Sequence, residues 1–273
     1  MGARIELQAR GVQVAYGRTV VVHGVDVELR GGMVTALIGP NGSGKSTLLR
    51  AFTRLHRPLA GSVTLADGAA VDELPARALA TRLTLLSQAR VAPGGVTVRE
   101  VVEYGRHPYR RGWRTEDVDG PAVVERVMAM TGVLDLAERP VDTLSGGQAQ
   151  RVWLASCLAQ DTTVLLLDEP TTYLDLRYQV ELLDIVRDLA DLHGIAVGIV
   201  LHDLDQAAAV ADEVVLLVDG RVAATGAVED VLLPDALSAA YGIAIDVDRD
   251  PATGLIRSRA VARHHRRETR TPA

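Results

Sequence analysis

The fold of this chain is decided by the stretch MVTALIGPNGSGKST, which occupies residues 33–47. Its first part, Met33 to Ile38, is a continuous apolar run, which predicts a buried strand. The second part is rich in glycine, and a helix is expected from Lys45 to about His56. A buried strand, a glycine-rich loop and a helix in this order predict an α/β fold whose loop binds phosphate.

The loop itself matches the pattern G-x-x-x-x-G-K-[ST] over residues 39–46. Glycines let backbone N–H groups turn toward phosphate oxygens, and the helix start adds partial positive charge. Lys45, the only lysine of the chain, is expected to reach the β- and γ-phosphates, and the Ser46 hydroxyl to bind Mg²⁺. A chance glycine turn is the alternative, which the flanking strand and helix disfavour. The candidate nucleotide-binding residues are Gly39, Pro40, Asn41, Gly42, Ser43, Gly44, Lys45, Ser46 and Thr47.

Two carboxylates follow a second apolar run. Residues 164–167 read VLLL and predict a strand, so Asp168 and Glu169 lie at its carboxyl end, where ligands of open α/β sheets bind. Asp168 suits Mg²⁺, because hard cations prefer oxygen ligands. Glu169 is placed to polarise an attacking water. Alone, such an acidic pair is more often a solvated turn; with the phosphate loop present, a catalytic pair is favoured.

Bulk composition limits the class of protein. The chain has 48% hydrophobic and 23% charged residues, which suits a globular protein with a substantial core. A net charge of −6 argues against binding nucleic acid, and the single cysteine, Cys157, cannot form an internal disulfide. Met1 to Arg10 shows no signal peptide, and no apolar run approaches the roughly 20 residues of a membrane span. A membrane role is therefore expected to depend on a partner.

The remaining apolar runs and periodic stretches give the organisation of the chain. Short alternating strands are expected over residues 4–30, a hairpin turning at Asp67-Gly68 over 63–71, and another short strand over 83–86. Buried strands are expected over 195–201 and 214–218, and helices over 98–104, 122–130 and 176–193. Strands that alternate with helices predict a mainly parallel sheet with helices on both faces. The expected domain covers residues 1–250, with a core of 1–88 and 161–250 and a helical subdomain of about 89–160; residues 251–273 are expected to be a disordered tail.

A further motif, LSGGQ, occupies residues 144–148. It predicts the start of a helix, with Ser145 as the cap and with Gly146 and Gly147 exposing backbone donors. Together with Gln148 these residues make a second potential phosphate site. Taken alone, the motif is equally well interpreted as a flexible turn.

These three motifs together resemble the nucleotide-binding subunit of ABC transporters, over about residues 5–244. The resemblance implies a P-loop NTPase fold, with an N-terminal antiparallel β-subdomain and an inserted helical subdomain. It also implies roles for four more residues: Tyr16 stacks on adenine, Gln88 senses Mg²⁺ and the γ-phosphate, Asp175 forms the D-loop, and His202 contacts the γ-phosphate. Alone, Tyr16 would more often be a packing residue, Gln88 a surface residue and His202 a structural one.

Taken together, the expected catalytic residues are Glu169, His202 and Gln88, and the expected Mg²⁺ ligands are Ser46, Gln88 and Asp168. The resemblance implies ATP and Mg²⁺ as cofactors and a homodimer or a paired ATPase subunit. In such a pair, Ser145 of each copy closes over ATP held by the Lys45 loop of the other. Further implied partners are transmembrane permease subunits and, indirectly, an extracytoplasmic solute-binding protein, with this subunit at the cytoplasmic face of the cell membrane. One departure is Ala149, where many relatives carry a longer polar residue; little consequence is expected.

Two segments narrow the kind of transporter. Residues 97–109, TVREVVEYGRHPY, and residues 171–179, TTYLDLRYQ, resemble the importers of iron–siderophore, haem and cobalamin. The first segment would dock onto the permease, in a groove that receives a short helix. The alternative is that Tyr104, His107 and Tyr109 only pack the helical lobe.

The sequence therefore predicts the ATP-hydrolysing subunit of an importer of iron–siderophore or a related metal chelate. An importer of another solute, such as haem or cobalamin, or an exporter is the alternative within the same class. A soluble ABC ATPase of repair or translation is a second alternative, although such proteins usually carry a fused second half, coiled-coil insertions or basic linkers. A metabolic kinase is a third, but it would leave LSGGQ and His202 without a role.

Overall fold

The computed structural model describes residues 3–87, 94–110 and 117–262. Its strands are β1 (Ile5–Tyr16), β2 (Thr19–Arg30), β3 (Val34–Ile38), β4 (Ala60–Leu65), β5 (Leu83–Leu86), β6 (Val164–Asp168), β7 (Ala196–Val200), β8 (Glu213–Val218), β9 (Arg221–Ala227), β10 (Ile245–Arg249) and β11 (Ile256–Ala260). Its α-helices are α1 (Lys45–Phe52), α2 (Ala76–Ala80), α3 (Val98–Tyr104), α4 (Gly120–Met130), α5 (Gly146–Leu158), α6 (Leu176–His193), α7 (Leu204–Val210), α8 (Val228–Val231) and α9 (Pro234–Tyr241).

The central sheet has the strand order β5-β6-β7-β3-β8-β9, and its first five strands run parallel. Only β9 is antiparallel, to β8. Every residue of β3, β6 and β7 is buried, because helices and a second sheet cover both faces. The prediction of an α/β protein with a mainly parallel sheet is confirmed, as are the buried strands expected over 164–167, 195–201 and 214–218.

The central sheet separates two hydrophobic cores, because successive side chains of a strand point to opposite faces. In β6, Leu165 and Leu167 lie in the core shared with α3–α6 and the C-terminal helices. Val164 and Leu166 of the same strand lie in the other core, with α1 and the N-terminal sheet. The phosphate-loop helix is therefore held between the two sheets.

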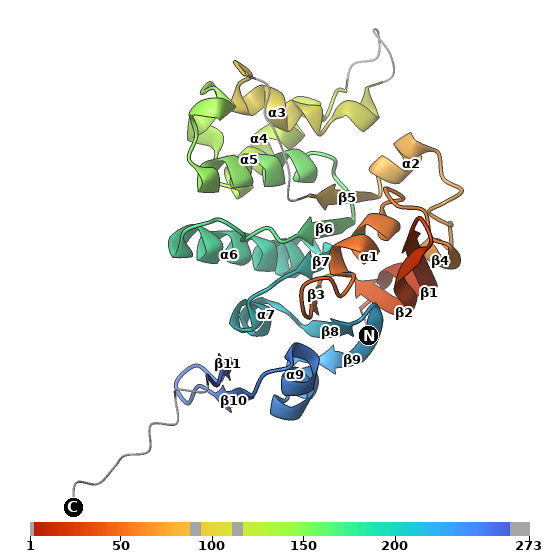
Figure 1. The fold of residues 1–273 in the computed structure, drawn as a ribbon. Helices are drawn as coiled ribbons and strands as arrows, with labels where there is room; N and C mark the ends of the chain where they lie inside the picture. Colours follow the sequence, from red (N-terminus) through yellow and green to blue (C-terminus); the bar gives the residue numbers. More distant parts are fainter. Residues whose placement is uncertain (1–2, 88–93, 111–116, 263–273) are drawn as a thin grey trace, which may run out of the picture.

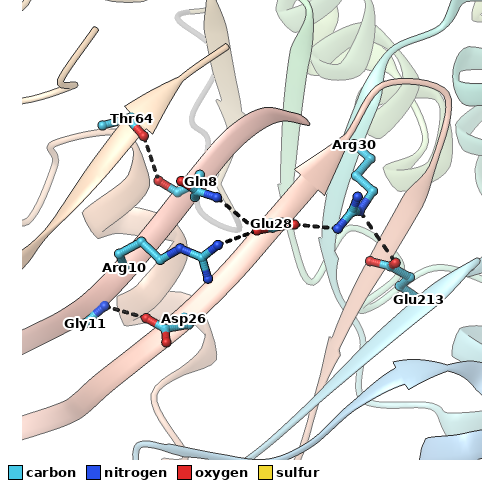
Figure 2. A network of polar contacts seen from close by, with 8 residues as sticks. All are labelled: Gln8, Arg10, Gly11, Asp26, Glu28, Arg30, Thr64 and Glu213. Atoms are coloured by element: carbon cyan, nitrogen blue, oxygen red, sulfur yellow. Dashed lines mark hydrogen bonds and ion pairs between the residues drawn. The ribbon is translucent and has the colours of Figure 1, made fainter. Parts of the chain in front are cut away.

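The N-terminal sheet is antiparallel, with the order β2-β1-β4. The short strands predicted here are in fact long, since β1 and β2 span 12 residues each. Figure 2 shows the polar network on this sheet, in which Glu28 accepts from Gln8, Arg10 and Arg30. Arg30 also lies 3.7 Å from Glu213 of β8, so the network joins the two sheets.

The helical lobe consists of α3, α4 and α5, which lie together at the top of Figure 1, above β5 and α6. The side chain of Thr97 and that of Glu100 form a reciprocal cap at the start of α3. Arg106 is almost fully buried and forms a two-pronged ion pair with Asp117, at 2.7 and 2.8 Å. This pair fixes the segment after α3 against α4.

Two further predictions differ from the observed elements. Helix α1 ends at Phe52, four residues before His56, because Arg54 adopts a left-handed backbone (φ 60°) that an α-helix cannot contain. Residues 256–260 lie in the segment predicted to be a disordered tail, but they form β11, which pairs with β10. Two hydrogen bonds from Ser258 to the Asp205 carboxylate, at 2.7 and 2.9 Å, fasten this hairpin to α7.

Within the described ranges, none of the helices has the length and apolar character that a bilayer span requires.

Candidate functional site

The glycine-rich loop connects the carboxyl end of β3 to α1. Gly39 has φ 139°, and a Cβ there would lie 2.0 Å from the Leu217 carbonyl oxygen. Gly44 has φ 97°, and a Cβ would lie 3.2 Å from the Val21 carbonyl oxygen. Both positions therefore require glycine. Around them, Asn41 and Gly42 are exposed, whereas the Ser43, Lys45 and Thr47 side chains are buried.

Lys45 folds back over this loop. Its Nζ donates hydrogen bonds to the carbonyl oxygens of Gly39 and Pro40, at 2.8 and 2.9 Å, and to Ser43 Oγ at 3.4 Å. Burial lowers the pKa of Lys45, while the nearby carboxylates of Glu169 and Asp168 raise it. The ammonium is thus held over the glycine-rich loop by carbonyl oxygens of the loop itself.

Asp168 ends β6 directly beside the start of α1. Its carboxylate is buried and accepts a hydrogen bond from Ser46 Oγ at 2.6 Å, and Arg50 lies 3.9 Å away. Burial raises the pKa of Asp168, and the Ser46 hydrogen bond opposes that rise. A hydroxyl and a carboxylate held this close are the oxygen donors that a hard divalent cation accepts.

Glu169 and His202 are brought together by neighbouring strands. Asp168 is in register with Val200 of β7, so the residues that follow the two strands meet at the same edge of the sheet. Glu169 Oε1 lies 2.6 Å from His202 Nε2. Glu169 has φ 53°, an uncommon backbone for a residue with a side chain, of the kind that collects at functional sites.

The LSGGQ motif, residues 144–148, is called the signature segment below, and it lies on the helical lobe at the start of α5. Ser145 caps the helix: Ser145 Oγ accepts from the Gln148 amide at 3.3 Å, and Gln148 Oε1 accepts from the Ser145 amide at 3.1 Å. Gly146 is open to solvent, whereas a Cβ on Gly147 would lie 2.3 Å from the Tyr178 ring. Within the part of the chain that the structure describes, no hydrogen bond or ion pair joins this segment to the phosphate loop.

The remaining predicted site residues are dispersed. Tyr16 ends β1 and is 46% exposed. Asp175 precedes α6 and is exposed, without a side-chain capping hydrogen bond. Gln88 lies outside the described residues.

Two residues that contact the site, Tyr241 and Gln206, belong to none of the sequence motifs. Tyr241 of α9 accepts a hydrogen bond from the Gly39 amide at 3.1 Å, and burial raises the pKa of this tyrosine. Gln206 of α7 contacts residues on either side of Asp175, since it accepts from Thr171 Oγ1 and donates to Gln179 Oε1, both at 2.9 Å. These contacts link segments far apart in the chain, so a sequence pattern does not predict them.

Comparison with known proteins identifies the family of the chain. The family model for ABC transporter matches residues 22–172. The chain is 40% identical over 251 residues to the ferric enterobactin transport ATP-binding protein FepC of Escherichia coli (strain K12), covering 91% of each. It is 41% identical over 246 residues to the probable siderophore transport system ATP-binding protein YusV of Bacillus subtilis (strain 168), covering 89% of this chain and 88% of that protein.

A solved inward-facing structure of an ABC transporter, described as of metal-chelate type, has the same fold. Its TM-score is 0.82 at 24% identity, covering 95% of this chain and 98% of that chain. Identity this low is evidence for the fold alone. The family model and the curated relatives carry the assignment further: this chain belongs to the ABC transporter family, among its ATP-binding transport ATPases.

Proposed function

We propose that this chain is the ATP-hydrolysing subunit of an importer for ferric siderophore or a related metal chelate. The observation that carries the proposal is the meeting of three elements at one sheet edge. These are the Lys45 loop, the Ser46–Asp168 pair joined at 2.6 Å and the Glu169–His202 pair joined at 2.6 Å. The relatives named for siderophore transport support the choice of solute.

In the proposed site, residues 39–47 hold the triphosphate and Tyr16 stacks on the adenine. Lys45 exchanges the loop carbonyls for β- and γ-phosphate oxygens. The donor set of Ser46 and Asp168 fits Mg²⁺, which commonly takes one or two protein oxygens and completes its shell with phosphates and water. When bound, Mg²⁺ would neutralise charge on the phosphates. Gln88 is a further proposed ligand and sensor.

Glu169 is the proposed residue that orients the attacking water. The 2.6 Å contact keeps its carboxylate directed toward His202, which itself contacts the γ-phosphate in this proposal. Since phosphoryl transfer has a loose transition state, these residues act mainly by positioning and by stabilising charge.

The signature residues Ser145–Gln148 are proposed to complete the site of a second copy. Gly146 is exposed at the start of α5, and the amides of a helix start suit the γ-phosphate of ATP bound by the partner. Asp175, exposed at the start of α6, is proposed to lie at the same dimer interface. ATP then joins the two subunits, and its hydrolysis lets them separate.

A permease is the proposed membrane partner, at the cytoplasmic face of the cell membrane, with a solute-binding protein as an indirect partner. The proposed place for a helix of the permease is a groove of about 360 Å³ between the end of α1, α2 and β5. Its lining residues include Leu55, Leu79 and Gln160. Tyr109 does pack the lobe, as the alternative had it, since its hydroxyl donates to the Gln160 carbonyl at 2.8 Å. Tyr104 is 54% exposed and remains free to contact a docked helix.

The test of the ATPase is the variant Glu169→Gln. It should bind ATP and form a stable dimer in sedimentation, while its hydrolysis rate falls at least about 100-fold. A matched control, Ser145→Arg, should bind ATP but remain a monomer. Brisk hydrolysis by Glu169→Gln, or the absence of an ATP-dependent dimer, would contradict the proposal.

The test of the solute is uptake by a strain that lacks this gene. The wild-type gene should restore uptake of labelled ferric siderophore, and the gene carrying Glu169→Gln should not. Restoration of haem or cobalamin uptake alone would assign one of those solutes instead.

A further inference from the structure

The aromatic side chain proposed to stack on adenine, Tyr16, contacts the ring of a histidine, His56. The ring centroids of Tyr16 and His56 lie 4.4 Å apart, with an angle of 60° between the planes. Tilted pairs at such distances are favourable, because the edge of one ring meets the face of the other. Tyr16 remains 46% exposed, so part of its ring stays open to a ligand.

A hydrogen bond fixes the histidine in this position. His56 Nε2 lies 2.8 Å from the carbonyl oxygen of Ala15, the residue directly before Tyr16. A carbonyl oxygen only accepts, so Nε2 carries the proton and donates it. His56 thus holds both the backbone and the ring of the Ala15–Tyr16 pair.

The segment that carries His56 is itself anchored at both ends. The His56 amide donates to the Arg50 carbonyl of α1 at 3.1 Å, and the Leu59 amide donates to the Gln13 carbonyl of β1 at 2.7 Å. Helix α1 begins at Lys45 in the phosphate loop. Helix α1 and the short segment that follows it therefore connect the glycine-rich loop with His56.

We infer that His56 is the positioning residue for Tyr16 and that it sets the part of the nucleotide affinity that depends on the base. This inference rests on the proposed function, in which Tyr16 stacks on adenine. An unsupported ring at a strand end would sample several rotamers and would lose that freedom on binding. A ring already held by His56 loses less, so binding is tighter.

The test compares the affinities of ADP and inorganic pyrophosphate, with magnesium, by calorimetry. Neither ligand has a γ-phosphate, and only ADP carries the base. His56→Ala should weaken ADP binding roughly 2- to 12-fold, the range that one aromatic pair supports, and leave pyrophosphate binding unchanged. His56→Phe, which keeps a ring, should recover most of the loss, and His56→Gln, without a ring, should recover less.

A double-mutant cycle tests whether His56 affects ADP binding through Tyr16. Tyr16→Ala should also weaken the binding of ADP but not that of pyrophosphate. The double variant Tyr16→Ala/His56→Ala should bind ADP no more weakly than Tyr16→Ala. Equal losses for ADP and pyrophosphate, no loss in His56→Ala, or full additivity would overturn the role of His56. If Tyr16→Ala itself left ADP binding unchanged, the proposed adenine site would fail, and this inference with it.

Discussion

Two adjacent glycines of the signature segment differ sharply in their surroundings, which leads to a prediction about stability. An ideal Cβ on Gly147 would lie 2.3 Å from Tyr178 Cγ and 2.7 Å from both Cδ atoms, whereas a Cβ on Gly146 would meet nothing within 4 Å. The nearest atoms belong to the base of the ring, so a small rotation of the side chain does not remove the clash. Gly147→Ala must therefore displace α6 or α5.

The magnitude follows from comparing the two substitutions. Both residues lie in the first turn of α5, so both alanines change the backbone entropy of the same helix in the same sense. That contribution largely cancels in the difference between the variants. What remains is the overpacking at Tyr178, which typically costs about 1–3 kcal/mol. For a chain of this size, Gly147→Ala should melt roughly 2 to 12 °C below Gly146→Ala.

The assay is thermal unfolding of the isolated, nucleotide-free subunit by circular dichroism. The control removes the ring: Gly147→Ala combined with Tyr178→Ala should be no less stable than Tyr178→Ala alone. If Gly147→Ala melts within about 1 °C of Gly146→Ala, the reasoning is refuted, and Tyr178 does not restrict this position.

Three further predictions concern other parts of the site. Burial raises the pKa of Asp168, so the charged carboxylate destabilises the fold once the pH is above that raised pKa. Asp168→Asn should therefore raise the melting temperature at pH 7, and this gain should shrink as the pH falls toward the ordinary pKa of 3.8. The same variant should hydrolyse ATP at least about 100-fold more slowly. A result in which the variant is less stable at pH 7 than at pH 4 relative to wild type would contradict this sign. In urea unfolding, the losses of unfolding free energy caused by Gln179→Ala and Gln206→Ala should differ from additivity by about 0.5–1.5 kcal/mol in the double variant. Additive losses would show that the hydrogen bond between the two amides does not contribute to stability. Burial lowers the pKa of Lys45, so an amine reagent should label it below the pH range of an ordinary lysine, and ATP should protect it; mass spectrometry that finds equal labelling with ATP would contradict its placement.

The parts of the molecule that the sequence predicts are those governed by local patterns. An uninterrupted apolar run is buried on both faces, so β3, β6 and β7 were predictable, and so was the position of Asp168 at a strand end. The end of α6 at Gly194 follows from the left-handed backbone of that glycine (φ 68°). These features depend on neighbours in the chain.

The remaining features depend on contacts between distant segments. The strand β11 forms because β10 and Asp205 supply partners for a polar stretch whose own pattern is weak. Tyr178 meets Gly147 only because α6 and α5 pack together. Such contacts follow no spacing pattern in the sequence, so the residues that support the site could not be predicted from it.

The hydrogen bond from Gly39 to Tyr241 spans 202 positions of the chain. Proteins are synthesised from the N-terminus, and early segments begin to fold before late ones emerge. The glycine-rich loop is made early, but it gains this partner only when α9 has left the ribosome. A nascent chain therefore carries an unfinished nucleotide loop, and full shaping of that loop waits until nearly the whole subunit has been translated.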